Sequence, residues 1–71
     1  MTDALKFKIA LLTAGITVSD LAEKIGVSRT YIYNCLNHKS DFRASEISAI
    51  ANVLGLTANQ TTSIFFARDV E

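Results

Sequence analysis

Apolar residues recur along most of this chain with the three-to-four-residue spacing of amphipathic helices. The spacing predicts five helices, over about 3–14, 17–25, 28–37, 44–54 and 57–68. Three of these segments open on a residue that can cap a helix N-terminus, and three end at a glycine: Thr17, Ser28 and Thr57, then Gly15, Gly26 and Gly55. We therefore expect an all-α fold.

Length and composition narrow the class of protein. The chain has 71 residues, so we expect a single domain over 1–71. Its hydrophobic content is 49% and it has no proline, which favours a compact helical domain over disorder. No apolar run approaches the ~20 residues of a membrane span, and no signal peptide is recognisable. The lone cysteine, Cys35, suggests a reducing cytosol and hence a cytoplasmic protein, with Cys35 itself as a small buried hydrophobe.

The second and third predicted helices have the pattern of a helix-turn-helix unit over about 17–37. They are joined by a short turn that contains Gly26, a residue that accepts the turn conformation without strain. Ala22 is small, as the closest approach of the two helices requires. Five apolar residues occupy the inward positions that fix the crossing angle: Leu21, Ile25, Val27, Ile32 and Cys35.

The outward face of the third helix is rich in hydrogen-bonding groups. Thr30, Asn34 and Asn37 lie opposite the apolar stripe, with Tyr31 and Tyr33 on the flanks. A merely solvated face is usually built from Lys, Glu and Gln, which are better helix formers, so this face favours a recognition surface. The net charge of the chain is zero, but 29–43 has a balance of +2, from three basic residues against one acid: Arg29, Lys39 and Arg43 against Asp41.

The stretch "VSDLAEKIGVSRTYIYNCLNHKS" resembles the Cro/repressor (XRE-type) helix-turn-helix family. The segments "DFRASEI" and "IFFARDV" are similar to small temperate-phage regulators of Gram-positive bacteria. The resemblance implies a compact five-helix, lambda-repressor-like DNA-binding domain that regulates transcription. It also implies that the third helix reads a double-stranded operator from the major groove, that the protein binds as a homodimer, and that it needs no cofactor.

The resemblance implies a role for individual residues by position. Base contacts fall on the N-terminal part of the third helix: Arg29, Thr30 and Asn34. Contacts to the DNA backbone fall on the flanking positions: Thr17, Ser28, Tyr31, Tyr33, Asn37, Lys39, Ser40 and Arg43. Two positions depart from the family pattern. Val18 stands where Gln is frequent, and His38 replaces a frequent glycine, so we expect the turn after the third helix to differ.

An enzyme or a metal site is not expected, because the chain has no paired acid and base, no nucleophile with a partner and no ligand spacing around His38. The serious alternative is an antirepressor or modulator that acts by binding a second regulator protein. Phe65 and Phe66 are compatible with that, because adjacent residues of a helix cannot both point inward. We expect one in the core and the other on a partner or dimer surface.

Overall fold

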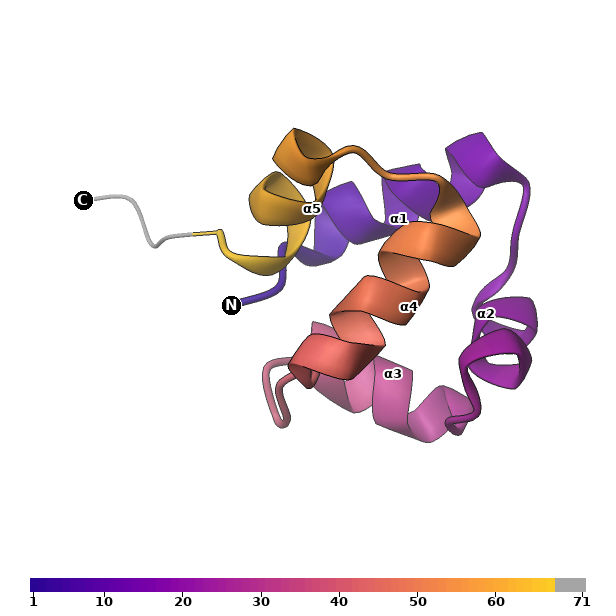
Figure 1. Ribbon diagram of the computed structural model, residues 1–71. Helices are drawn as coiled ribbons and strands as arrows, with labels where there is room; N and C mark the ends of the chain where they lie inside the picture. The colour runs from indigo at the N-terminus through magenta and orange to yellow at the C-terminus, as the bar shows by residue number, and fades with distance from the viewer. Residues whose placement is uncertain (68–71) are drawn as a thin grey trace.

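The computed structural model describes residues 1–67, and in this part of the chain it confirms an all-α fold (Figure 1). The helices are α1 (Ala4–Ala14), α2 (Val18–Ile25), α3 (Arg29–Leu36), α4 (Ala44–Leu54) and α5 (Ala58–Phe65). The first four agree with the predicted segments once the capping residues are counted. The prediction was therefore most accurate where a helix has both a local start signal and a local stop signal.

The N-termini of α2, α3 and α5 are capped by the residues that the sequence indicates, and α1 is capped by Asp3. The Asp3 carboxylate accepts from the Lys6 amide at 3.0 Å. Thr17 and Asp20 form a reciprocal capping box at the start of α2. Such caps satisfy amide groups that have no partner within the helix, so they fix where each helix begins.

Helix α5 ends earlier than predicted. The sequence suggested an end near Arg68, which lies outside the described residues, whereas α5 ends at Phe65. Phe66 leaves helical geometry with φ −122° and ψ 34°. The carbonyl of Ile64 accepts a 2.7 Å hydrogen bond from the amide of Asp3, so the N-terminal segment satisfies the last turn of the helix.

The end of α3 also corrects a prediction. His38 was expected to change the turn because it replaces a glycine, but it adopts the left-handed conformation itself, with φ 63°. The amide of Lys39 donates to the carbonyl of Asn34 at 2.8 Å, and that of His38 to Cys35 at 3.2 Å. This is the Schellman arrangement that also ends α1 at Gly15. The helix therefore stops in the usual way, with a histidine in the glycine position.

The core lies around α4, which crosses the middle of the molecule with α1 and α5 on one side and α2 and α3 on the other (Figure 1). Phe42, from the loop before α4, lies at the centre of an aromatic cluster. Its ring stacks on Phe7 at a centroid distance of 5.8 Å and meets Phe65 and Tyr31 edge to face at 5.7 and 6.0 Å. This cluster joins α1 and α5 to α3, so the core holds α3 directly. Within residues 1–67, none of the helices has the length and apolar character needed to cross a membrane.

Candidate nucleic-acid interface

The outward face of α3 presents a continuous set of polar and aromatic side chains. Ile32, Cys35 and Leu36 are buried against the core, and the opposite side of the helix is open to solvent. That side carries four residues that can hydrogen bond: Thr30, Tyr33 and Asn37, which are exposed, and Asn34, which is half-buried. Arg29 is also exposed, but it stands seven residues before Leu36 and so lies at the edge of this face. Of the three residues predicted to contact bases, Thr30 and Asn34 therefore share this face with Tyr33, and Arg29 lies beside it at the N-terminal end of α3.

Helix α2 holds the N-terminal end of α3. The Oγ of Ser28 accepts from the amide of Tyr31 at 3.0 Å, so Ser28 caps α3 and its hydroxyl hydrogen remains free to donate. The guanidinium of Arg29 reaches back to the Oγ of Ser19 on α2, at 3.5 Å. Thr17 has the same capping role on α2, where its Oγ1 accepts from the amide of Asp20 at 3.1 Å. Thr17 and Ser28, two of the predicted backbone contacts, thus lie at helix N-termini, which attract anions.

The two tyrosines of α3 have different environments, although both were predicted to contact the DNA backbone. Tyr33 is 47% exposed. Tyr31 is half-buried and its hydroxyl donates to Oε1 of Glu46 at 2.6 Å, with the carbonyl oxygen of Asp41 at 3.2 Å. The hydroxyl hydrogen of Tyr31 is therefore used within the protein, whereas the hydroxyl of Tyr33 makes no hydrogen bond to any residue among 1–67.

Glu46 connects α3 to the start of α4. Its Oε1 also accepts from the backbone amide of Arg43, the N-cap of α4, at 2.8 Å. The Arg43 side chain has no acceptor, so it cannot cap the helix itself. Desolvation raises the pKa of Glu46, but the hydrogen bonds from Tyr31 and from the Arg43 amide outweigh it, and the net pKa is lowered. Glu46 is therefore ionised at neutral pH. The same hydrogen bond, with burial, raises the pKa of Tyr31 and keeps its phenol neutral.

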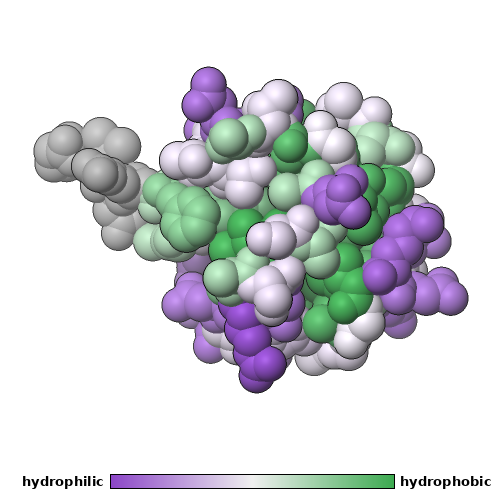
Figure 2. Space-filling model, in the orientation of Figure 1, coloured by the Kyte–Doolittle hydropathy of each residue, from purple (hydrophilic) through white to green (hydrophobic). Residues whose placement is uncertain are grey.

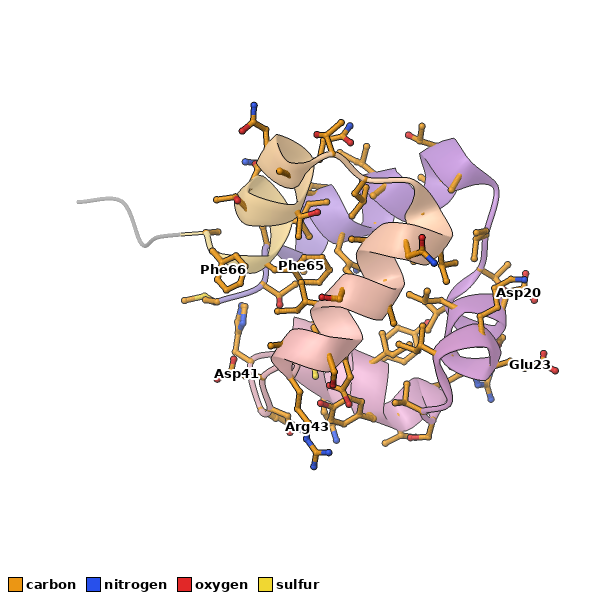
Figure 3. All side chains as sticks on the ribbon, in the orientation of Figure 1. Asp20, Glu23, Asp41, Arg43, Phe65 and Phe66 are labelled. Carbon is orange, nitrogen blue, oxygen red and sulfur yellow. The ribbon has the colours of Figure 1, made fainter. Side chains whose placement is uncertain are left out.

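The loop between α3 and α4 carries the basic side chains. Lys39 and Arg43 are exposed and Ser40 is half-buried. Figure 3 shows Arg43 projecting from the lower edge of the molecule, and Figure 2 shows hydrophilic side chains at this edge, where α3 and the loop lie. The acidic residues of α2, Asp20 and Glu23, project from a different side (Figure 3). The positive charge that the sequence assigned to 29–43 therefore borders the exposed face of α3.

Other candidate groups lie outside this surface. Cys35 is a buried free thiol, as predicted, and burial raises its pKa, so it is not a reactive thiolate at neutral pH. Among residues 1–67 no group of His, Cys, Asp and Glu is arranged to hold a metal ion. Of the two adjacent phenylalanines, Phe65 is 3% exposed and packs in the core, whereas Phe66 is 58% exposed and points outward (Figure 3). Only Phe66 therefore stays a candidate for a partner or dimer surface.

Sequence reasoning assigned no role to two residues that position this surface. Glu46 could have been noticed because it stands three residues after Arg43, the capping-box spacing at a helix start. Phe42 had no comparable signal. It lies in a loop, yet it is 8% exposed and its ring contacts Tyr31 of α3.

The comparisons with known proteins agree with this geometry. A family model described as helix-turn-helix, of the XRE type, matches residues 7–60, which include α2, α3 and the turn between them. Neither the search of curated proteins nor the search of solved structures found a match. The matching family is one of DNA-binding transcription regulators and is typically not enzymatic. The chain therefore belongs to the XRE-type helix-turn-helix family.

Proposed function

We propose that this protein is a sequence-specific, double-stranded DNA-binding transcriptional regulator of the Cro/repressor kind. The observation that carries the proposal is the exposed face of α3, where hydrogen-bonding side chains replace the Lys and Glu of an ordinary solvated helix. Helix α3 has eight residues, a length of roughly 12 Å, which is about the width of the major groove. A DNA-bound α3 would thus place the N-terminal part of its open face within reach of base edges.

The side chains on this face suit base recognition. Arg29 is suited to pair bidentately with guanine and Asn34 with adenine, each contributing roughly 1–3 kcal/mol of discrimination. Thr30 can donate a hydrogen bond or contact a thymine methyl group. Because Tyr33 lies on the same open face, we add it to these candidates, beyond the backbone contact suggested by the sequence.

The surrounding residues suit the DNA backbone. Thr17 and Ser28 offer hydroxyl groups at the N-termini of α2 and α3, and Lys39 and Arg43 offer positive charge from the loop. Asn37 and Ser40 lie in the same segment. Few basic residues are available per monomer, so the salt dependence of binding should be shallow, with each neutralised phosphate adding about −0.9 to the logarithmic slope.

We further propose that the protein binds DNA as a homodimer over two half-sites about 34 Å apart. The exposed ring of Phe66 lies to one side of the α3 surface, and it borders a small hollow of about 150 Å³ that is also lined by Met1 and Ile47. A second copy packed on this side would leave both α3 helices facing one duplex. We also propose that the protein is a temperate-phage regulator of a Gram-positive host and that it represses transcription.

The test is a fluorescence-anisotropy titration of the protein on the DNA that flanks its own gene, with scrambled DNA of equal length and composition as the control, at two salt concentrations. Saturable binding that prefers the flanking DNA is expected. A lack of preference at micromolar protein would overturn the operator-binding proposal and would favour the alternative of a modulator that binds another regulator.

A further inference from the structure

Helix α1 is apolar on two opposite sides. Phe7 and Leu11 are buried in the core, but Leu5, Ile9 and Leu12 are 69%, 52% and 80% exposed. These three residues have the i, i+4, i+7 spacing of one helical face, so they form a continuous apolar stripe on the surface. An amphipathic helix of a monomeric domain normally has a polar outer face. The α1 stripe, defined as Leu5, Ile9 and Leu12, is therefore a surface that lacks a partner within the described chain.

A groove continues this stripe. Ile9 also borders a hollow of about 390 Å³ between α1, the end of α4 and α5. Its lining is mostly apolar or small, with contributions from Ala10, Leu54, Leu56 and Ile64 among others. The stripe and the groove together offer a ridge and a hollow side by side, which suits the side chains of a packed helix.

Both charged side chains within α1 are positive, and the acidic Asp3 precedes the helix as its N-cap. Lys6 and Lys8 flank the stripe on its two sides, and α1 contains no acidic residue. The Nζ of Lys6 donates to the Oγ of Ser63 on α5 at 2.7 Å, so this ammonium is held at the rim of the groove. Lys6 is also the only charged residue that lines the groove within the described residues. An occupant with acidic side chains beside its apolar stripe would match this surface.

Two observations argue against a second copy of the chain as the occupant. A two-fold axis through the α1 stripe would bring Lys8 of both copies close together with no acid on α1 to compensate. The stripe also lies on the side of α1 opposite Phe7. The ring of Phe7 stacks on Phe42, and Phe42 contacts Tyr31 of α3. Since α1 and α3 lie on opposite sides of α4 (Figure 1), copies paired through α1 would face their α3 helices apart. Only this last step depends on the proposed DNA binding.

We propose that the α1 stripe and its groove form a docking site for an acidic amphipathic helix of another protein. The site lies on the side of the molecule away from α3, so the partner and DNA can be bound together. The protein would then connect a DNA site to a second protein through a surface separate from the Phe66 side.

The test uses two synthetic, fluorescein-labelled helical peptides with the same leucine stripe, one with glutamate and one with lysine at the flanking positions. The full chain should bind the glutamate peptide at micromolar concentration and the lysine peptide about fivefold or more weakly, from two exposed ion pairs. Leu5→Ser with Leu12→Ser should weaken the glutamate peptide roughly tenfold or more through lost apolar contact. Phe66→Ser, the matched exposed control, should leave this affinity unchanged.

Charge reversal gives the sharpest readout. Lys6→Glu with Lys8→Glu should invert the preference, so that the lysine peptide binds better. Equal affinity for both peptides, or no binding at about 100 μM, would overturn the proposal. Self-association that Leu5→Ser with Leu12→Ser abolishes, measured by sedimentation, would assign the surface to a second copy. Binding to phosphatidylglycerol vesicles that Leu5→Ser with Leu12→Ser abolishes would assign the surface to a membrane. Leu5→Ser with Leu12→Ser changes no charge, so this variant should keep wild-type affinity for operator DNA, and failure of this proposal is separable from failure of DNA binding.

Discussion

The hydroxyl of Tyr31 in α3 donates a 2.6 Å hydrogen bond to the carboxylate of Glu46 in α4, and this bond ties the candidate recognition helix to the next helix of the fold. Glu46 accepts from the Arg43 amide at the same time, so one carboxylate orders both α3 and the start of α4. Tyr31 thereby contributes to the DNA-facing surface through its position in the fold.

Replacing Tyr31 with phenylalanine should lower the free energy of unfolding by about 1–2 kcal/mol. The variant keeps the aromatic contact with Phe42 but removes a donor from a partly buried, ionised carboxylate. Urea unfolding followed by circular dichroism measures the change. Tyr33→Phe is the matched control, because the Tyr33 hydroxyl makes no hydrogen bond within the described residues and its loss should change stability little. Equal losses from both variants would contradict the role given to the Tyr31–Glu46 bond.

Stability should fall at acid pH because of Glu46. Its pKa is lower in the folded protein than in the unfolded chain, so the unfolded chain binds more protons as the pH falls. The contribution is present above the ordinary Glu pKa of about 4.3 and is lost as the pH falls through the folded value. Urea unfolding at a series of pH values should show a smaller acid loss for Glu46→Gln than for the wild type.

At alkaline pH the sign is opposite. The pKa of Tyr31 is raised by its hydrogen bond to Glu46 and by burial, so the folded protein retains the phenol proton when the unfolded chain releases it. Stability should therefore decline as the pH rises above about 10. Tyr31→Phe should remove this part of the decline, and an unchanged alkaline profile in that variant would show that another group is responsible.

Glycine at position 38 should stabilise the protein by up to about 1 kcal/mol. His38 has φ 63°, a conformation that costs a residue with a side chain roughly 1–2 kcal/mol, and the flexibility of glycine offsets part of the gain. Asn37→Gly is the control, because Asn37 has φ −93° and gains nothing from glycine. Thermal unfolding should show a higher melting temperature for His38→Gly than for Asn37→Gly. A loss of stability in His38→Gly would show that the positive φ of His38 does not strain the backbone.

The adjacent phenylalanines should respond very differently to substitution. Phe65→Ala should cost about 3–5 kcal/mol, because Phe65 packs against Phe7 and Phe42 in the core. Phe66→Ser should change stability by no more than about 0.5 kcal/mol, because its ring is exposed. If the proposed dimer uses this side, Phe66→Ser should also weaken self-association on DNA. Urea unfolding and sedimentation with operator DNA measure the two effects.

Two substitutions on the proposed DNA surface should distinguish contacts to bases from contacts to phosphates. Asn34→Ala should relax specificity at one base position at a cost of roughly 1–3 kcal/mol. Lys39→Ala should weaken binding to all sequences alike and lower the salt slope by about 1. Anisotropy titrations against operators with single base changes, at several salt concentrations, distinguish the two. Equal, sequence-independent losses would contradict this division between base and phosphate contacts.

Local signals in the sequence were sufficient for most helix boundaries. Thr17 with Asp20 and Thr57 with Gln60 have capping-box spacing, and both boxes form in the structure. These interactions join residues three apart, so they depend little on the rest of the fold. The end of α5 was misplaced because no glycine follows Phe65 to mark it in the sequence. In the structure the carbonyl of Ile64, near this end, accepts from the amide of Asp3, which is far away in the sequence.

The candidate DNA surface was predictable in part. The helical period alone places Thr30 and Asn34 opposite Ile32, so their position on the outward face follows from the sequence, although Asn34 is half-buried. The period could not separate Tyr31 from Tyr33, because both lie near the boundary between the two faces. Their difference comes from neighbours that other segments supply: Phe42 and Glu46 cover Tyr31, and no described residue covers Tyr33 to the same degree.

The sequence by itself therefore determined the helices, the helix-turn-helix unit and the composition of the exposed α3 face, since caps and periodicity act over three or four residues. Tertiary structure alone decided three further points. Phe42 became a core residue although it lies in a loop, Phe65 was buried in preference to Phe66, and α1 kept an apolar stripe in solvent. Each depends on which distant segments meet, and that is set by packing the whole chain, because a side chain is buried only where another element covers it.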